Sequence, residues 1–326
     1  MKRSATDPLG DTAGVATLGQ WLRFAESAYA RVGAVSGQVA TNAHDEALYL
    51  LLRTLRLPLE SGPGVLARRL TAAEFGRISA VFRRRLVDRV PAAYLTREAW
   101  LGENRFYVDE RVIIPRSFFL EIIPQLKMAR HEGVRSQLLT SEAEAESWEL
   151  SPSCSRLRIA DVCTGSGCLA VLLARRFPRA TVDAIDVSAD ALAVAKINLA
   201  AYRLTRRVRL WRSDIFDAVP EAAYDLIVSN PPYEPSALVA ALPAEFRREP
   251  RLALDGGADG LDVIRRLLRQ TRTRLQPRGR VLIEVGGLRT AIRREFRALQ
   301  PRWLATADGS DCICEIGADA LRGWKG

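Results

Sequence analysis

Between residue 157 and the C-terminus, apolar runs with strand composition alternate with helical patterns, and this alternation constrains the fold most strongly. Strands connected through helices run parallel, and the helices then cover both faces of one sheet. Near the C-terminus, Asp308-Gly309 separates two further strand-like runs, as in a hairpin turn. We therefore predict an α/β, Rossmann-like fold that ends in an antiparallel hairpin. The expected strands are 157–162, 182–185, 208–211, 225–228, 281–285, 303–306 and 312–316, and the expected helices are 169–177, 189–202, 261–275 and 290–299.

The sequence before residue 157 has a different pattern. Apolar residues recur at helical spacing over 18–32, 45–57 and 71–90, which predicts three helices. Further on, 106–108 and 112–114 have strand composition and flank a short polar stretch, which predicts a β-hairpin. We expect a disordered N-terminus at 1–16, a helical domain at 17–95, a linking β-hairpin at 96–117, a helix and flexible Ser- and Glu-rich insertion at 118–156, and the sheet domain at 157–326.

Three consecutive strand ends carry residues suited to ligand binding. After the first strand, Gly165 and Gly167 form a Gly-x-Gly loop before a helix, where backbone N–H groups can bind a ligand. The second strand ends in Asp186, about 20 residues beyond the glycines, where an acid can accept hydrogen bonds from both hydroxyls of a ribose. Asp214 follows the third strand. A glycine loop and two acids at one edge of a sheet predict a ligand site.

The ligand predicted at this edge is an adenosyl compound without a pyrophosphate. The sequence shows no second phosphate-binding motif, and no Walker lysine follows the glycines. These features favour S-adenosyl-L-methionine over a dinucleotide as the cofactor. A parallel sheet with a terminal antiparallel hairpin also matches the architecture of the class I S-adenosylmethionine-dependent methyltransferases. Because a fold alone does not define a substrate, the substrate must be inferred from the loops.

The loop Asn230-Pro231-Pro232-Tyr233 follows the strand at 225–228. Proline lacks an N–H and fixes φ, so the Pro-Pro pair must end the strand. An amide or exocyclic amine is a poor nucleophile because its lone pair is delocalised. The Asn230 side-chain oxygen and the Pro231 carbonyl can accept its two N–H groups and orient its nitrogen, while Tyr233 packs on its flat face. The four residues are therefore candidate catalytic residues for a planar NH₂ substrate, either a glutamine side chain or an adenine.

Charge and composition restrict the partners and the location of the protein. The formal net charge is +10, which indicates a polyanion such as RNA, or a partner bound to one. Only four of the 48 basic residues are lysine, however, and codon composition explains such an arginine bias equally well. The sequence has no export signal and no apolar run of about 18 residues, so we expect a cytoplasmic protein without a membrane partner. Five cysteines and two histidines fit no zinc framework, so we expect packed thiols and no metal.

Four motifs together resemble the protein-(glutamine-N5) methyltransferases. Within that family they are most similar to the branch that methylates a glutamine of large-subunit ribosomal protein three. The features that favour this branch are the Tyr-Val-Asp-Glu-Arg stretch, Pro-Arg-Ser in place of Pro-Arg-Pro, and Cys163 where the family often has its first glycine. The resemblance covers residues 18–318, and its motifs are Phe106–Ser117, Asp161–Cys168, Asn230–Tyr233 and Leu242–Asp262.

The resemblance implies a role for each matching residue. It implies that Asp186 binds the ribose of S-adenosylmethionine, that Asp214 lies near the adenine, and that 230–233 hold the glutamine. The helical domain is then the part that recognises the substrate protein, which is ribosomal protein three, free or within a ribosome assembly intermediate. The further implied cofactor-binding residues are Asp161, Cys163, Thr164, Gly165, Gly167 and Asn230, and the implied substrate-side residues are Arg116, Glu245 and Glu249.

Three alternatives remain open from the sequence. A sister enzyme that methylates the glutamine of peptide-chain release factors shares the chemistry, and only the hairpin and Cys163 distinguish the two. An adenine-N6 nucleic-acid methyltransferase shares Asn-Pro-Pro-Tyr and is favoured by the basic charge, but no RNA-binding module is evident. A cofactor-binding or assembly factor without turnover is disfavoured by the intact Asn230 and Tyr233.

Overall fold

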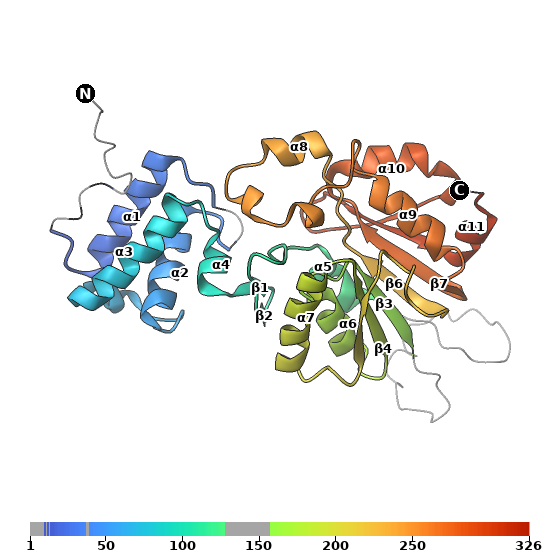
Figure 1. Ribbon diagram of the computed structural model, residues 1–326, viewed down its shortest axis with the longest axis horizontal. Coiled ribbons are helices and arrows are strands. Elements are labelled where there is room, and N and C mark those ends of the chain that lie inside the picture. The colour runs from blue at the N-terminus through green and yellow to red at the C-terminus, as the bar shows by residue number, and fades with distance from the viewer. Residues whose placement is uncertain (1–9, 11, 13, 37–38, 128–156, 326) are drawn as a thin grey trace.

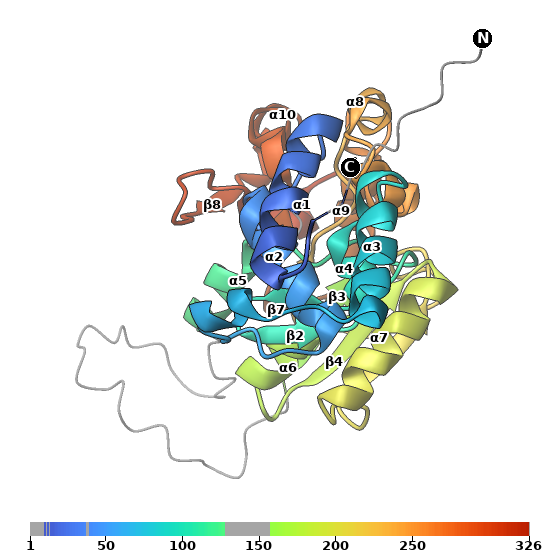
Figure 2. The same cartoon turned by 90° about the vertical axis from the view of Figure 1, so that its left-hand side faces the viewer.

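The computed structural model describes residues 10, 12, 14–36, 39–127 and 157–325 (Figure 1). A helical domain lies at one end of the molecule, and a sheet covered by helices lies at the other. Most of the N-terminus predicted to be disordered, and the insertion up to residue 156 that was predicted to be flexible, lie outside the described residues. Figure 2 shows the helical domain in front of the sheet.

The helical domain contains the three predicted helices and one short additional helix. Each of the three longer helices begins at a side-chain cap, from Thr17, Asn42 and Thr71, and such caps satisfy backbone N–H groups that lack helical partners. Trp21 is fully buried and packs edge-on against Phe75 at a centroid distance of 4.7 Å. The helices are α1 (Leu18–Val32), α2 (Ala43–Leu55), α3 (Ala72–Leu86) and α4 (Ala92–Thr96).

The predicted hairpin of 106–108 and 112–114 is wrong. The antiparallel pair is formed earlier, by β1 (Ala99–Leu101) and β2 (Asn104–Phe106). After Phe106 a side chain takes the place of a partner strand: the Asn198 amide accepts from the Tyr107 N–H (2.8 Å) and donates to the Tyr107 carbonyl (3.0 Å). The apolar residues beyond this point are buried in a loop, which pattern alone does not distinguish from a strand.

The sheet has seven strands in the order β5-β4-β3-β6-β7-β9-β8. The first five pair in parallel, and β9 pairs antiparallel with both β7 and β8. The α/β fold and its terminal antiparallel hairpin are therefore confirmed. The strands are β3 (Arg158–Val162), β4 (Thr181–Asp186), β5 (Val208–Arg212), β6 (Tyr224–Ser229), β7 (Leu275–Glu284), β8 (Arg302–Leu304) and β9 (Ile313–Gly317).

Helices cover both faces of the sheet, as Figure 1 shows. Side chains of α5, α6 and α7 form one apolar core with the sheet, and side chains of α9, α10 and α11 form the other. The helix predicted at 261–275 ends early because Leu275 already pairs with Tyr224 as the first residue of β7. The helices are α5 (Phe119–Ile122), α6 (Cys168–Arg176), α7 (Ala189–Ala201), α8 (Ser236–Ala241), α9 (Asp262–Thr271), α10 (Arg289–Glu295) and α11 (Ala318–Gly323).

The strand order places the candidate site. In the middle of the sheet β3 lies between β4 and β6. The chain adds β4 and β5 on one side of β3 and then β6 and β7 on the other side, so the order of the strands reverses at this point. A crevice opens at the carboxyl ends of the strands where the order reverses, and open α/β sheets bind ligands there. Among the described residues, no helix combines the length and apolar composition needed to cross a membrane.

Candidate functional site

A cavity of about 560 Å³ lies at the carboxyl ends of β3, β4, β5 and β6. Its volume is within the range typical of sites for small molecules and cofactors. Most of the residues predicted from the sequence share this cavity, but Asp161, Gly167, Glu245 and Glu249 lie outside its lining. The predicted residues that line it are Arg116, Cys163, Thr164, Gly165, Asp186, Asp214, Asn230, Pro231, Pro232 and Tyr233.

The two glycines of the loop after β3 have different surroundings. Both have positive φ, 54° at Gly165 and 80° at Gly167, a region that L side chains rarely adopt. A Cβ at Gly165 would have no neighbour within 4 Å, whereas one at Gly167 would lie 3.1 Å from the Ala195 Cβ of α7. Gly165 therefore leaves its backbone open to a ligand, and Gly167 allows close packing of two helices. Cys163 also has a positive φ of 63°, in the left-handed region.

Asp161 lies beneath the glycine loop and is fully buried. Thr164 Oγ1 donates to its Oδ2 at 2.5 Å, whereas Oδ1 has no hydrogen-bond partner among the described residues. Burial raises the pKa of this carboxyl to about 7. The carboxyl lies outside the cavity lining, so it acts on the site by holding the glycine loop through Thr164.

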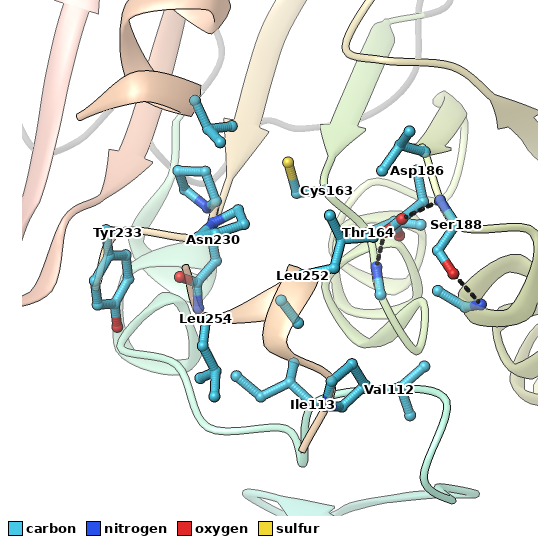
Figure 3. A pocket seen from close by; sticks show the side chains of 18 of the residues that line it. Val112, Ile113, Cys163, Thr164, Asp186, Ser188, Asn230, Tyr233, Leu252 and Leu254 are labelled. Carbon is cyan, nitrogen blue, oxygen red and sulfur yellow. Dashed lines mark hydrogen bonds between the residues drawn. The ribbon is translucent and has the colours of Figure 1, made fainter. Parts of the chain in front are cut away.

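Asp186 and Asp214 line the opposite part of the cavity from the Asn-Pro-Pro-Tyr loop. Asp186 accepts from the Gly165 N–H at 2.8 Å and from the Ser188 N–H at 2.9 Å, as Figure 3 shows, and burial raises its pKa. Asp214 forms an ion pair with Arg266. Carboxylates accept hydrogen bonds from hydroxyl groups, so these positions suit the ribose side of an adenosyl group.

The Asn-Pro-Pro-Tyr loop leaves the end of β6, across the cavity from Asp186 (Figure 3). Ser229, immediately before it, is fully buried, and its Oγ donates to the Val162 carbonyl of β3 at 2.7 Å. This bond fixes the start of the loop against the strand that carries the glycine loop. Glycines also pack on Tyr233: a Cβ at Gly286 would lie 2.5 Å from the Tyr233 ring, and one at Gly260 would lie 2.3 Å from its carbonyl oxygen.

Arg116 lines the cavity from the loop that follows the hairpin. Its guanidinium forms a bidentate ion pair with Glu249, at 2.8 Å and 3.0 Å, and its Cζ lies 5.3 Å from the centre of the Phe246 ring. Glu249 is 3% exposed, so its carboxylate faces Arg116 and not the cavity. Glu245 is also buried, next to arginines of the helical domain.

The sequence prediction missed the apolar residues that line the cavity and one buried acid outside its lining. Apolar side chains cover one wall, including Val112, Ile113, Leu252 and Leu254 (Figure 3). They belong to motifs that the resemblance singled out, but their apolar character gave no chemical signal. Glu284 is the last residue of β7, as Asp186 is the last residue of β4. Its place at the end of a strand could have identified it from the sequence.

Glu284 lies behind the Arg116 loop. It is 3% exposed and accepts a hydrogen bond from the Ser117 hydroxyl, and burial raises its pKa to about 7. The carboxylate thus holds the start of α5, which follows the cavity wall. The thiols of Cys163, Cys168, Cys312 and Cys314 are free, and among the described residues no group of three or more His, Cys, Asp or Glu could hold a metal ion.

Several known proteins resemble this chain over nearly its whole length. Residues 136–246 match the methyltransferase small domain family. A ribosomal protein uL3 glutamine methyltransferase of Burkholderia pseudomallei is 42% identical over 312 residues, which are 94% of this chain and 95% of that protein. Proteins of the same name from Bordetella pertussis (44%; 94% and 96%) and Neisseria meningitidis serogroup B (43%; 94% and 95%) are similar over nearly their whole lengths.

Proposed function

The chain belongs to the ribosomal protein uL3 glutamine methyltransferases, as its motifs predicted, and from this membership we propose its reaction and the role of each site residue. The protein transfers a methyl group from S-adenosyl-L-methionine to the side-chain amide N5 of a glutamine in ribosomal protein uL3. It is an enzyme, and S-adenosylmethionine is its cofactor.

One observation carries the assignment of roles. Asn230 and Tyr233 at the end of β6 lie across one cavity from Asp186, and the glycine loop lies between them on the adjacent strand β3 (Figure 3). A donor held on the β3–β4 side and an amide held on the β6 side therefore share one cavity. The Ser229–Val162 hydrogen bond fixes the relative position of these two sides.

The cofactor residues follow from the chemistry of their side chains. S-adenosylmethionine supplies an electrophilic methyl group on a positively charged sulfur, and it also carries an amino group and a ribose. We assign the ribose hydroxyls to Asp186, the adenine side to Asp214, and the open backbone at Gly165 to close approach of the ligand. Asp161, which lies outside the cavity lining, holds the glycine loop beside the cofactor through its bond with Thr164. Cys163 and Thr164 supply part of the wall, and Gly167 shapes the loop from behind.

The target residues act by position and polarity. The Asn230 side-chain oxygen and the Pro231 carbonyl accept the two N–H groups of the glutamine amide, which turns the nitrogen toward the methyl donor and favours its pyramidal form. Pro232 keeps the loop rigid, and Tyr233 packs against the flat face of the amide. The nitrogen becomes acidic as it gains the methyl group, so the proton passes to solvent and a strong base is unnecessary.

The setting of the reaction is also proposed. The substrate is a ribosomal protein, so we propose that the enzyme acts in the cytoplasm, where ribosomes assemble. Its net charge of +10 is suited to contact with RNA that accompanies the substrate in an assembly intermediate.

The test offers labelled S-adenosylmethionine with three separate substrates: ribosomal protein uL3, a peptide-chain release factor, and unmodified ribosomal RNA. We expect label in uL3, located on a glutamine by mass spectrometry. Label in release factor alone would assign the chain to the sister activity, and label in RNA alone would assign it to adenine methylation. Repeating the uL3 reaction with a ribosome assembly intermediate tests the RNA contact, because a higher rate that falls steeply with salt is then expected.

A further inference from the structure

Glu245 is a buried carboxylate whose hydrogen-bond partners belong to the helical domain. It is 1% exposed, although it lies in the segment that follows α8 in the sheet domain. Its Oε1 accepts from Arg89 at 2.8 Å, from Arg85 at 3.3 Å and from the Val35 N–H at 3.2 Å. The three donors come from segments that the chain places more than 150 residues before Glu245.

The arginine beneath Glu245 is built into the helical domain. Arg85 of α3 is fully buried, donates to Glu46 of α2 at 2.6 Å and to the Val35 carbonyl at 2.7 Å, and lies 5.2 Å from the centre of the Tyr29 ring of α1. Buried charges are costly unless they are paired, and removal of one partner leaves an uncompensated charge in the interior. Glu245 therefore docks at a prepared position.

Glu249, four residues further on, makes the second connection. It holds Arg116 of the cavity wall with both carboxylate oxygens, and it accepts from the Ile114 N–H at 3.4 Å. Only one short helical turn, Phe246–Arg248, separates the two glutamates. We call residues 245–254 the arm. In Figure 1 this segment, which follows α8, lies between the sheet and the helical domain.

The arm continues directly into the cavity. Leu252 and Leu254 line it together with Arg116, Ile113 and Asn230, and Figure 3 shows Leu254 near Asn230. On the cofactor side, Asp186 accepts from the Gly165 N–H and from the N–H of Ser188, the N-cap of α7, so these contacts do not include the arm. The helical domain is thus connected, through two carboxylates, to the half of the cavity where the target glutamine binds.

We propose that Glu245 is a positioning residue, which docks the arm on the helical domain and, through Glu249 and Arg116, sets the wall of the glutamine side of the cavity. The proposal rests on the proposed function, which identifies this side of the cavity as the place where the glutamine binds. It also differs from the implied role of Glu245 and Glu249 as residues that contact the substrate, since both carboxylates already bind arginines of this chain.

The first test is Glu245→Gln in the full chain, with uL3 as substrate. Loss of the charge weakens docking, so we expect the KM for uL3 to rise about tenfold, while kcat and the Kd of S-adenosylmethionine change less than about twofold. Glu98→Gln is the matched control. Glu98 is another nearly buried carboxylate, paired with Arg53 and Arg105, but it does not touch the arm. The Glu98→Gln variant should therefore have the same KM for uL3 as the wild type.

A second readout does not depend on turnover. The Ile114 N–H bonds to Glu249 and not to Glu245, so hydrogen exchange of the peptide containing Ile114 reports transmission along the arm. We expect hydrogen exchange of this peptide to be faster in Glu245→Gln than in the wild type and unchanged in Glu98→Gln. Glu245→Asp keeps the charge, so its exchange rate should return part of the way to that of the wild type. If Glu245→Gln does not fold, Arg89→Gln serves instead. It removes the 2.8 Å contact to Glu245 and the bonds of Arg89 to the Gly33 and Val32 carbonyls, and it leaves Arg85 in place.

The outcomes separate this inference from the proposed function. Unchanged KM and unchanged exchange at Ile114 in a folded Glu245→Gln variant would overturn the inference. Equal losses in cofactor affinity and kcat would also overturn it, because they indicate general disruption and not positioning of one side. If the wild-type protein methylates none of the offered substrates, the proposed function fails, and the exchange at Ile114 still decides whether the arm is coupled to the helical domain.

Discussion

The carboxylate of Asp186 accepts a hydrogen bond from the backbone N–H of Gly165 at 2.8 Å. The acid that ends β4 thus also holds the glycine loop that follows β3. One side chain therefore has two functions in the proposed cofactor site: it fixes the loop, and it offers its remaining acceptor capacity to the ribose.

Replacement of Asp186 by Ala removes both functions. We expect the affinity for S-adenosylmethionine to fall about ten- to a hundredfold, the range for lost hydrogen bonds to a charged group. Isothermal calorimetry measures the change. Asp190→Ala, at an exposed position in the first turn of α7, is the control and should bind the cofactor as the wild type does. Equal affinity of the two variants would contradict the assignment of Asp186.

Replacement of Asn230 by Ala should affect the methyl transfer and leave the cofactor site intact. The side-chain oxygen of Asn230 is proposed to bind the amide as it becomes pyramidal, so its loss should lower kcat by about a hundredfold or more. The Kd of the cofactor should change little, because the proposed contacts to the ribose and adenine are made by Asp186 and Asp214, at the ends of β4 and β5, and not by Asn230. Single-turnover transfer to uL3, together with calorimetry, separates these effects, and unaltered turnover would reject the mechanism.

Two adjacent glycines provide a matched test of how Tyr233 is held. Gly286 has a φ of 49°, and a Cβ there would lie 2.5 Å from the Tyr233 ring, whereas a Cβ at Gly287 would meet nothing within 4 Å. We expect Gly286→Ala to lower the free energy of unfolding by about 2 kcal/mol and to lower kcat, since Tyr233 must move. Gly287→Ala should stay within about 0.5 kcal/mol of the wild type and retain its kcat. Denaturant unfolding and initial rates test both variants.

Glu284 makes the stability of the protein depend on pH. Burial raises its pKa from 4.5 to about 7, so between these values the folded protein holds a proton that the unfolded chain has lost. The contribution of Glu284 to the free energy of unfolding is therefore fully present below about pH 4.5 and is lost as pH rises through 7. This loss is absent in Glu284→Gln. The free energy of unfolding of the variant, relative to that of the wild type, should therefore be about 2 kcal/mol higher at pH 8 than at pH 5. Urea unfolding at both pH values measures the gain, and a difference that does not vary with pH would contradict it.

The sheet domain was largely predictable because its signals are local. Each parallel strand is an apolar run followed by a glycine, an acid or the Asn-Pro-Pro-Tyr loop, and the residues at the ends of β3, β4 and β6 meet at one cavity as expected. The Asn-Pro-Pro-Tyr loop was recognisable because two prolines cannot continue a strand and because its polar groups match an amide.

What the sequence did not reveal depends on contacts between distant segments. The hairpin was misplaced because Asn198 of α7 binds the backbone of Tyr107, 91 residues away, in place of a partner strand. The partners of Glu245 and Glu249 were equally invisible, since arginine is abundant in this chain and a pattern does not show which arginine faces which acid. The raised pKa of Glu284 is likewise a result of burial that only the packed structure shows.

The position of β3 between β4 and β6 has a consequence for the nascent chain. During synthesis β3 and β4 emerge from the ribosome first, and β3 keeps an open edge until β6 arrives, because Ser229 and its partner Val162 are 67 residues apart. An open edge is a template for unwanted pairing with other chains. A chain that stops before residue 229 would carry the glycine loop and Asp186 but no place for the target amide. Both sides of the cavity therefore exist only after β6 has paired with β3, and β7, β9 and β8 must then still join the sheet.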